Sequence, residues 1–528
     1  MSDFDWWRGA VMYQIYPRSF KDTNGDGVGD LKGITSSLDY VASLGVDGVW
    51  ISPFFKSPMK DFGYDIESYR DIDPLFGTMD DFDQLIFKAH HLGLKVIIDM
   101  VLSHTSEYHE WFQESRKGKD NPKANWYVWA DAKADGSPPN NWRSVFGGEA
   151  WEFDTRRGQY YLHNFLKEQP DLNFHEPDVH KHILEACEFW LERGVDGFRL
   201  DEINYIYHDK ELRDNPPADF EKHGPATQFQ KIDPYSMQQH LYDKSRPEAL
   251  DFLKKLRLLA DKYDGTMMLA EVGDTSTTLP GEYTDGPEML HTAYSFGLLG
   301  YEKLTFSTLK SVINDFSSQS DASWPSWAFS NHDVIRAASR WGDYVDRTYR
   351  DELTKTLIAL LCALRGTVFM YQGEELGFTE AQIPYEQLQD PWGIYLWPEW
   401  QGRDGCRTPM AWKHDVQNAG FTDDQAKPWL PISDAHKNSA INLQEKDAGS
   451  FLHFTRKMIA FRKKHAAFKN GDMDFLDSPD DELIAFTRQD DKARFLCLFN
   501  LSEKHIDYSL QDFKARKDGA YLAGNDEK

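Results

Sequence analysis

The sequence has few cysteines, no long apolar run and comparatively little positive charge. Its 528 residues include 4 cysteines, scattered without a CxxC pair at Cys187, Cys362, Cys406 and Cys497. This spacing predicts neither a disulfide framework nor a zinc site, and it is typical of a reducing compartment. The longest apolar run, near residues 357–364, is far shorter than the ~20 residues that a membrane-spanning helix needs. The opening MSDFDWWRGA lacks the basic and apolar regions of a signal peptide, so we expect a cytoplasmic location and no membrane partner.

The shortage of positive charge excludes a second class of partner. Lys and Arg number 59 against 86 Asp and Glu, which gives a net charge of −27. So acidic a chain repels nucleic acid and anionic membrane surfaces, and neither is expected to bind. Aromatic residues are plentiful by contrast: the 17 Trp suit a packed core and aromatic-lined clefts.

Eight short apolar segments alternate with helical patterns along most of the chain. Near-continuous apolar strands separated by helices are typical of a parallel sheet that is buried on both faces. Eight such units predict an α/β fold, the (β/α)8 or TIM barrel. The predicted strands are residues 11–16, 48–53, 95–101, 194–201, 266–271, 292–296, 325–333 and 367–371.

Breaks in this alternation divide the chain into predicted domains. Residues 102–173 are rich in Trp, Asn, Pro and Gly, and we interpret them as a subdomain inserted after the third strand. Residues 1–101 and 174–465 form the barrel, with an extended loop at about 373–440 after the eighth strand. Residues 466–528 change to short alternating strands, which predicts a C-terminal antiparallel β-sandwich domain.

Acidic residues follow three of the predicted strands. Asp201, Glu271 and Asp333 come at the ends of the fourth, fifth and seventh strands, where the chemistry of a (β/α)8 barrel takes place. Two facing carboxylates are what cleavage of a glycosidic bond requires, because one attacks the anomeric carbon while the other protonates the leaving oxygen. The third would stabilise developing positive charge or bind sugar hydroxyls.

The two expected roles need carboxyl groups with different pKa values. Arg199 lies two residues before Asp201, on the same face of the strand, and we expect it to keep Asp201 ionised. Glu271 follows the apolar segment MMLA, and burial there would raise its pKa towards that of a proton donor. Taken alone, the Arg199–Asp201 pair is equally compatible with a structural ion pair beneath a loop.

Residues 22–30 (DTNGDGVGD) alternate oxygen donors with glycines. The pattern follows the first half of an EF-hand loop but departs from it at the twelfth position, where Gly33 replaces the bidentate Glu. The acids repel one another without a cation, so we favour a metal site over a polar surface turn. The predicted cofactor is a structural Ca²⁺ or Mg²⁺ ion, and no organic cofactor is expected. The predicted ligands are Asp22, Asn24, Asp26, Asp30 and the carbonyl oxygen of Val28.

Several segments occur together in an order and spacing that resemble glycoside hydrolase family 13, the α-amylase family. They are residues 48–53, Asp99 with His104, residues 169–173, residues 197–201, Glu271-Val272, residues 331–333 and residues 366–374. The resemblance implies a retaining double displacement with Asp201 as nucleophile, Glu271 as acid/base and Asp333 as transition-state stabiliser. It also implies that the non-reducing glucose is bound by Asp61, Tyr64, His104, Phe146, Arg199, His332 and Arg403.

Further motifs resemble one branch of this family. QPDLN at 169–173 is similar to the oligo-1,6-glucosidase and α-glucosidase branch, and segments 212–217 and 242–248 are similar to bacterial exo-acting α-glucosidases. The resemblance implies a retaining exo-α-glucosidase that hydrolyses short, maltose-like α-glucosides from the non-reducing end and also transfers glucose. The small-molecule α-glucoside is then the expected partner of a monomer or homodimer.

Two other functions use the same barrel. A glucosyltransferase or isomerase, such as a trehalose synthase-like or sucrose-cleaving enzyme, would share every catalytic residue and remains the alternative. A non-catalytic chain of a transporter complex is disfavoured, because it would lack the three acids and carry a membrane helix.

Two positions depart from the family pattern. Ser103 stands where amylases carry an Asn that ligates an interdomain calcium, so the resemblance implies that this second site is absent. Glu202 follows the expected nucleophile where α-glucosidases carry a small or apolar residue. Because that position borders the aglycone, we assign Glu202 to substrate binding and leave the preferred linkage open. Pairing of Glu202 with a basic group of the long loop 202–247 is the other interpretation.

Overall fold

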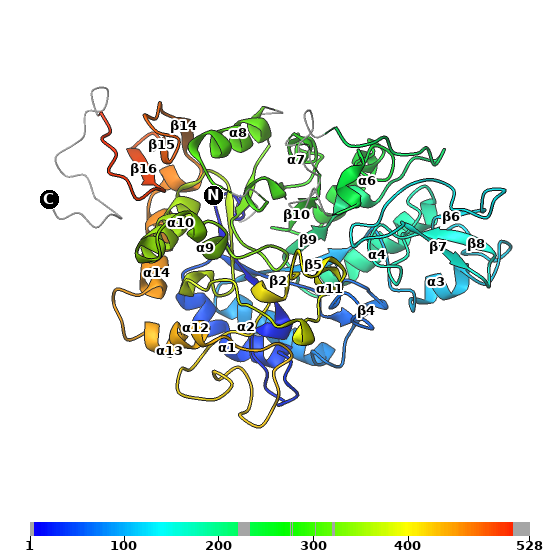
Figure 1. The fold of residues 1–528 in the computed structure, drawn as a ribbon, viewed down its shortest axis with the longest axis horizontal. Coiled ribbons are helices and arrows are strands. Elements are labelled where there is room, and N and C mark those ends of the chain that lie inside the picture. Colours follow the sequence, from blue (N-terminus) through cyan, green and yellow to red (C-terminus); the bar gives the residue numbers. More distant parts are fainter. Residues whose placement is uncertain are drawn as a thin grey trace.

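The chain folds around a sheet of eight parallel strands (Figure 1). The computed structural model describes residues 5–219, 233–274, 276, 278–300, 303–318 and 323–509. In space the strands follow the order β11-β10-β9-β5-β2-β1-β13-β12. They are β1 (Val11–Ile15), β2 (Gly48–Ile51), β5 (Lys95–Val101), β9 (Gly197–Asp201), β10 (Met267–Val272), β11 (Thr292–Ser295), β12 (Ser326–Ala328) and β13 (Thr367–Tyr371). The predicted (β/α)8 barrel is confirmed.

The edge strands β11 and β12 close the barrel. An isolated parallel bridge between Ala293 and Pro325 joins them. β12 is shorter than the sequence predicts, because it ends at Ala328 and residues 329–333 leave the sheet as a loop. Residues outside a ladder are not tied to its alternation of faces, so this loop can turn its polar side chains towards the mouth of the barrel.

Alternate side chains of each strand fill the barrel and contact the surrounding helices. On β1, Met12 belongs to an inner apolar cluster, whereas Val11 and Tyr13 belong to the larger core beneath the helices. Burial on both faces explains why the strands read as continuous apolar runs. The inner cluster also contains Trp50, Ile97, Met267, Leu269, Tyr294 and Phe369.

Helices surround the sheet (Figure 1). Their ends follow ordinary capping rules: at the start of α2, the Thr78 side chain accepts from the backbone of Asp81, whose carboxylate accepts from the backbone of Thr78. The helices after the barrel strands are α1 (Leu31–Ser43), α2 (Met79–His91), α4 (Pro177–Glu192), α6 (Ala249–Ala260), α7 (Leu279–Glu282), α8 (Phe306–Ser317), α9 (Ala337–Arg340), α10 (Arg350–Ala363) and α14 (Phe451–Lys464).

Long excursions extend the loops that follow β2, β5 and β13. After β2, the strands β3 (Phe55–Lys56) and β4 (Ser68–Ile72) pair antiparallel. After β5 comes α3 (Glu110–Ser115) and an antiparallel sheet in the order β6-β8-β7, formed by β6 (Trp129–Ala130), β7 (Trp151–Asp154) and β8 (Gln159–Leu162). After β13 come α11 (Pro391–Leu396), α12 (Asp434–Asn438) and α13 (Ile441–Gln444). The β6–β8 sheet falls within the predicted insert.

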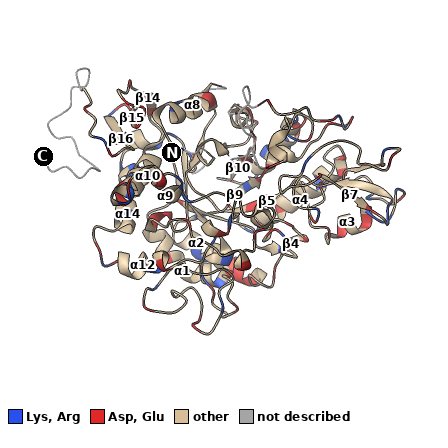
Figure 2. Cartoon of the chain, viewed as in Figure 1, with Lys and Arg blue, Asp and Glu red and all other residues tan. Residues whose placement is uncertain are grey.

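A second antiparallel sheet follows α14 and α15 (Ala466–Lys469). It consists of β14 (Asp472–Phe475), β15 (Leu483–Gln489) and β16 (Arg494–Asn500), as the period-two pattern predicts. This sheet and the β6–β8 insert lie at opposite ends of the molecule (Figure 1). The barrel strands are mainly free of charged residues, which gather on helices and loops (Figure 2). No helix in the described ranges is long and apolar enough to cross a membrane.

Arg462 connects α14 to the amino-terminal end of the barrel through hydrogen bonds. Its side chain is completely buried and donates to the carbonyl oxygens of Gly9 at 3.1 Å, Cys362 at 2.8 Å, Leu364 at 2.8 Å and Gly366 at 2.5 Å. Burial lowers its pKa to about 10, which still leaves the guanidinium charged at neutral pH. One side chain thus satisfies carbonyls that no helix or strand would otherwise bond.

Replacing this arginine should destabilise the barrel without touching the opposite end. We expect Arg462→Leu to lower the free energy of unfolding by about 3 kcal/mol or more, because it leaves several buried carbonyls without a donor. Thermal melting measures the change. Arg456→Leu, also on α14, removes an ion pair with Glu445, which follows α13; it is the control and should cost at most about 1 kcal/mol. Equal effects of the two substitutions would contradict the anchoring role.

Candidate active site

Three acidic side chains meet at the carboxyl ends of the barrel strands. Asp201 ends β9, Glu271 lies near the end of β10 and Asp333 lies in the loop after β12. They line a cavity of about 150 Å³. Two further predicted residues, Arg199 and His332, lie beneath it and bond to groups that line it. The predicted residues that line the cavity directly are Asp61, Tyr64, His104, Phe146, Asp201, Glu202, Glu271, Asp333 and Arg403.

The buried guanidinium of Arg199 joins the acids from below. Nη1 donates to Asp99 Oδ1 at 2.7 Å and to Asp201 Oδ1 at 2.5 Å, and Nη2 donates to Glu271 Oε2. The group also lies over Trp50, 5.0 Å from the ring centroid. Burial by itself lowers the pKa of Arg199, but the carboxylates of Asp99 and Glu271 raise it well above its ordinary value. This cation is therefore permanent, and it holds the two catalytic candidates side by side.

Opposing effects act on the pKa of Asp201. Arg199 does pair with Asp201 and favours the ionised form, as expected. Burial has the larger effect, however, and raises the pKa of Asp201 well above its ordinary value, with the negative charge of Glu271 acting in the same direction. The predicted pairing of Arg199 with Asp201 is present, and the same cation is shared among several buried acids.

Glu271 is oriented by two further donors. The hydroxyl of Tyr294 on β11 donates to Oε1 at 2.7 Å, and the backbone N–H of Glu202 donates to Oε2 at 3.2 Å. The second bond depends on the left-handed backbone of Glu202, with φ 37° and ψ 48°, which turns the chain sharply after Asp201. Because both of its oxygens are bonded, the Glu271 carboxyl has a fixed orientation at the cavity wall.

Basic side chains surround Asp333. Its Oδ1 accepts from Arg403 Nη1 at 3.1 Å and from Arg407 Nη2 at 2.8 Å, while His332 Nε2 lies 3.1 Å from Oδ2. Burial favours the protonated acid, but the charges of Arg403 and Arg407 outweigh it, and the pKa of Asp333 is lowered. Asp333 is therefore ionised over the working pH range and can face a developing positive charge.

His332 belongs to a chain of hydrogen bonds that ends on Asp99. Gln14 Nε2 lies 2.8 Å from Nδ1 of His332 and donates to it, so the ring hydrogen is on Nε2. The hydroxyl of Tyr64 lies 2.5 Å from that nitrogen and donates to Asp99 Oδ2 at 3.1 Å. Burial lowers the pKa of His332 well below its ordinary value, so the imidazole is neutral. The chain links the Arg199 cluster to Asp333.

A second polar cluster contributes Asp61, His104 and Arg403 to the cavity wall. Gln169 Nε2 lies 3.2 Å from Asp61 Oδ2 and 3.1 Å from His104 Nε2. Arg403 Nη2 donates to Asp61 at 3.0 Å and to Asp390 at 2.8 Å. Burial raises the pKa of Asp61 to about 6 and lowers that of His104 to about 4, so near neutral pH the acid is ionised and the imidazole is neutral. Such groups suit the hydroxyls of a sugar better than an apolar ligand.

Aromatic side chains form much of the remaining wall. Phe146 and Phe165 come from the segment after β5, and Trp392 comes from α11. The ring of Phe146 lies 5.4 Å from that of Trp392, and the guanidinium of Arg403 lies 4.9 Å from the Phe146 centroid. Segments that are far apart in the sequence thus share one apolar rim around the acids.

The whole chain can now be compared with known proteins. It matches the α-amylase catalytic domain over residues 14–471. The chain belongs to the α-amylase family. It is 53% identical to a probable α-glucosidase of Rhizobium meliloti (strain 1021), over 95% of this chain and 90% of the relative. It is 38% identical to an oligo-1,6-glucosidase of Parageobacillus thermoglucosidasius, over 98% of this chain and 94% of the relative.

A solved structure agrees with this placement. The crystal structure of the α-glucosyl transfer enzyme XgtA matches this chain with a TM-score of 0.90 and 51% identity, covering 94% of this chain and 91% of that one. The resemblance drawn from the motifs is confirmed, and the protein is a glycoside hydrolase of the α-amylase family.

The loop 22–30, which is predicted to bind a metal ion, directly precedes α1. Asp22 Oδ1 accepts from the backbone of Asn24 at 2.9 Å, Asp26 Oδ1 accepts from the backbone of Val28 at 2.9 Å, and Asp30 caps α1. Within the described residues, no three His, Cys, Asp or Glu side chains converge as metal ligands would. Asn24 and Asp26 are exposed, and the donor atoms offered are all oxygens, which are the ligands that Ca²⁺ takes. The ion stays a prediction.

The sequence did not single out several residues that hold the site. Tyr294 lies in a weakly apolar strand that gives little signal in the sequence. In the structure it lies in register with Glu271 on the neighbouring strand β10. Arg407 and Asp390 lie in the long segment after β13, and the charged neighbours of Arg403 were the only signal there. Lys244 also lines the cavity, from the segment before α6. These contacts depend on which loops meet, and a single sequence does not show that.

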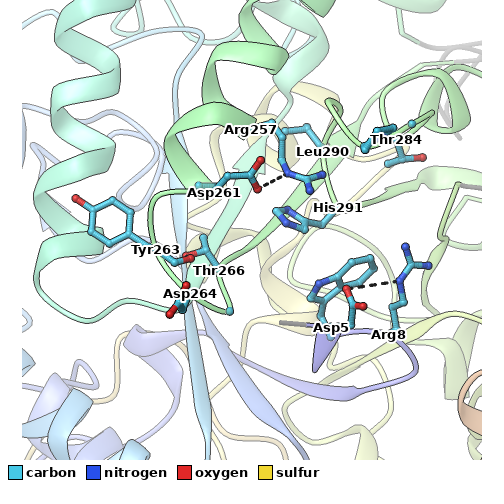
Figure 3. Close-up of a pocket in the computed structure, with 15 residues that line it drawn as sticks. Asp5, Arg8, Arg257, Asp261, Tyr263, Asp264, Thr266, Thr284, Leu290 and His291 are labelled. Carbon is cyan, nitrogen blue, oxygen red and sulfur yellow. Dashed lines mark hydrogen bonds and ion pairs between the residues drawn. The ribbon is translucent and has the colours of Figure 1, made fainter. Parts of the chain in front are cut away.

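A second cavity, of about 500 Å³, lies where β10 and β11 begin (Figure 3). It contains the ion pair of Arg257 with Asp261, at 2.7 Å, and that of Arg8 with Asp5, at 4.0 Å. It is larger than the first cavity, but none of the residues predicted for catalysis or substrate binding lines it. Chemistry in (β/α)8 barrels takes place at the other, carboxyl-terminal end, so the smaller cavity is the candidate active site.

Glu202 generates a prediction about pH and stability. Burial, together with the charge of Glu271, raises its pKa from 4.5 to about 8, while Lys244 opposes the rise. The folded state therefore binds this proton more tightly than the unfolded chain, and the stability so gained is complete below pH 4.5 and is lost as the pH rises towards 8. We expect Glu202→Gln, which cannot ionise, to escape that loss.

Melting curves of the two proteins at several pH values test this expectation. The stability of Glu202→Gln relative to the parent, obtained from these curves, should rise between pH 4.5 and about pH 8 by about 1 kcal/mol per pH unit, and it should level off above pH 8. Glu386→Gln, at an exposed acid, is the control and should run parallel to the parent. Parallel curves for Glu202→Gln as well would show that Glu202 titrates normally.

Proposed function

We propose that the protein is a retaining, exo-acting α-glucosidase that hydrolyses short α-glucosides and transfers glucose to acceptor hydroxyls. The observation that carries the proposal is that Asp201 and Glu271 are held by neighbouring nitrogens of Arg199. Carboxylates so closely set favour the retaining geometry, with about 5–5.5 Å between the groups, over the wider spacing of inverting enzymes. The named activities of the relatives support the same reaction class.

In the first step Asp201 attacks the anomeric carbon as Glu271 gives its proton to the glycosidic oxygen. The bond to the aglycone breaks, the aglycone leaves as an alcohol, and a glucosyl ester forms on Asp201. In the second step Glu271 takes a proton from water, the oxygen attacks the anomeric carbon, and the ester bond breaks to return the Asp201 carboxylate. Asp333 faces the positive charge that the sugar ring carries in both transition states.

Buried polar groups in the cavity wall support the exo mode. Asp61, His104 and Gln169 form a hydrogen-bonded cluster, and Arg403 ties Asp61 to Asp390. A wall of buried polar groups suits the terminal glucose of a chain, because an inner glucose would need an open path through this wall for the rest of the chain.

Free buried cysteines, found at all four positions, support a reducing, cytoplasmic location.

The alternative is a glucosyltransferase or isomerase that excludes water from the second step. The similarity to the structure of the α-glucosyl transfer enzyme XgtA supports keeping this alternative. A time course of products from maltose, isomaltose, sucrose and trehalose separates the two, with the anomer of each product measured. Release of α-glucose is expected from at least one substrate. Conversion without free glucose would replace hydrolysis by transfer or isomerisation.

The nucleophile can be tested directly. We expect Asp201→Asn to lower kcat by about 10⁴-fold or more, because the amide cannot form the glucosyl ester. Circular dichroism and melting should show that the fold is retained. Asp196→Asn, which precedes β9 at the opposite end of the barrel, is the matched control and should keep its activity. Activity of Asp201→Asn near that of the parent would reject the assignment.

We further propose that the loop 22–30 binds a structural Ca²⁺ through the oxygens of Asp22, Asn24, Asp26, Val28 and Asp30. Magnesium suits the loop less, since it demands stricter octahedral geometry. The ion would stiffen the segment that leads into α1 and would take no part in the reaction.

Removal of the ion should reduce stability more than activity. We expect a chelator to lower the melting temperature, by an amount equivalent to about 2.7 kcal/mol if calcium was present at 100 times its Kd. The initial rate at low temperature should change little. Asp26→Asn should weaken the response to chelator. A melting curve that is the same with chelator, calcium and magnesium would contradict the proposed site.

A further inference from the structure

Lys244 is a buried cation on the wall of the catalytic cavity. Only 4% of the residue is exposed, and it lines the cavity between β9 and α6. Its Nζ donates to the carbonyl oxygen of Gly273 at 2.7 Å and to the hydroxyl of Tyr205 at 3.3 Å. The rings of Tyr205 and Tyr235 lie 5.1 Å and 5.4 Å from the nitrogen. An ammonium has three N–H donors, so these contacts leave one for another partner.

Glu202 offers the complementary group on the same wall. Its Oε2 is covered, yet no hydrogen-bond partner meets it within the described part of the chain. The carboxyl group lies against Gly273, since a Cβ added to that glycine would come within 2.1 Å of Oε2. Gly273 therefore contacts both groups: its carbonyl oxygen accepts from the Lys244 ammonium, and its Cα lies against the Glu202 carboxyl group. An unsatisfied buried acceptor costs about 1–3 kcal/mol, which suggests that a ligand supplies its partner.

The two groups do not satisfy each other. Among the described residues, Lys244 forms no ion pair within 4.0 Å, although its charge does act on Glu202. Direct pairing of Glu202 with Lys244 is therefore not observed, while Lys222, His223 and Lys231 of the long loop lie outside the described residues. A donor and an acceptor that face one cavity without bonding each other fit a ligand group that both accepts and donates. A hydroxyl is the common group of that kind.

The position of this wall says which hydroxyl it meets. Glu202 directly follows Asp201, and its backbone N–H bonds to Glu271, the group that handles the leaving oxygen. The cluster of Asp61, His104 and Arg403 occupies a different part of the cavity. We infer that Lys244 is a specificity-determining residue on the aglycone side, where it donates to a hydroxyl of the leaving or accepting alcohol while Glu202 accepts from that hydroxyl. The inference rests on the proposed glucosidase and transferase function.

The competing explanation is that Lys244 only anchors a loop to Gly273. Lys355 provides the comparison, because its Nζ also donates to a glycine carbonyl, that of Gly449 at 2.9 Å, and lies 5.4 Å from the ring of Phe451. It has no part in the cavity. A merely structural lysine should act on all substrates alike. A lysine that binds the aglycone should act only on substrates whose aglycone has hydroxyls.

The experiment compares two substrates that share the glucosyl group. The aglycone of maltose is a glucose with several free hydroxyls. The aglycone of 4-nitrophenyl α-glucoside has no hydroxyl besides the oxygen of the bond that is cleaved. For Lys244→Met we expect the ratio of kcat/KM for maltose to kcat/KM for the aryl glucoside to fall about tenfold, as for the loss of one hydrogen bond from a charged donor. Lys355→Met should keep the ratio of the parent. Glu202→Met should lower the ratio too.

The double variant sharpens the test. If both side chains bind the same hydroxyl, Lys244→Met combined with Glu202→Met should lower the ratio little further than either alone, because the effects of coupled groups are not additive. Proportional losses on both substrates, or an unaltered ratio in an active enzyme, would overturn the inference and leave the proposed function standing. Should Lys244→Met fail to fold, an unaltered ratio for Glu202→Met overturns it equally. If the parent protein cleaves neither glucoside, the proposed function fails first.

Discussion

The candidate site depends on one buried cation, Arg199, and on the acids gathered around it. A guanidinium without access to water is unfavourable alone, and so is each carboxylate that it meets. Together they are stable, because the negative charges of Asp99, Asp201 and Glu271 replace the water that burial removes from around the arginine. The three acids come from β5, β9 and β10, so the same contact that neutralises the charge also aligns three neighbouring strands.

A second group of charges is arranged around Asp333. Arg403 and Arg407 bind this acid, and Arg403 also binds Asp61 and Asp390. The two groups differ in sign: around Arg199 acids share one cation, and around Asp333 cations share one acid. Because the two groups have opposite charge balances, the acids of one cavity have different pKa values. The neutral ring of His332 stands between them.

Most of the fold could be predicted from the sequence, because buried parallel strands and amphipathic helices leave strong periodic signals. The acids at the strand ends followed from the same reasoning. What could not be predicted is how deeply each group is buried: the sequence indicates that Arg199 pairs with Asp201, but not that burial opposes the effect of Arg199 on the pKa of Asp201. Tyr294 and Lys244 were missed because their roles arise from register and loop contact. The end of β12 was placed too late because the apolar run continues to Phe329, beyond the last paired residue.

The barrel closes between β11 and β12, where an isolated bridge joins Ala293 to Pro325. Tyr294, which orients Glu271, lies on one of these strands, and Asp333 follows the other. Native proteins open first where the fewest backbone hydrogen bonds hold them. A brief parting of this seam would misalign the acid/base and the transition-state acid while the rest of the barrel stays intact. Heat would then reduce the activity at a lower temperature than the one at which the protein unfolds.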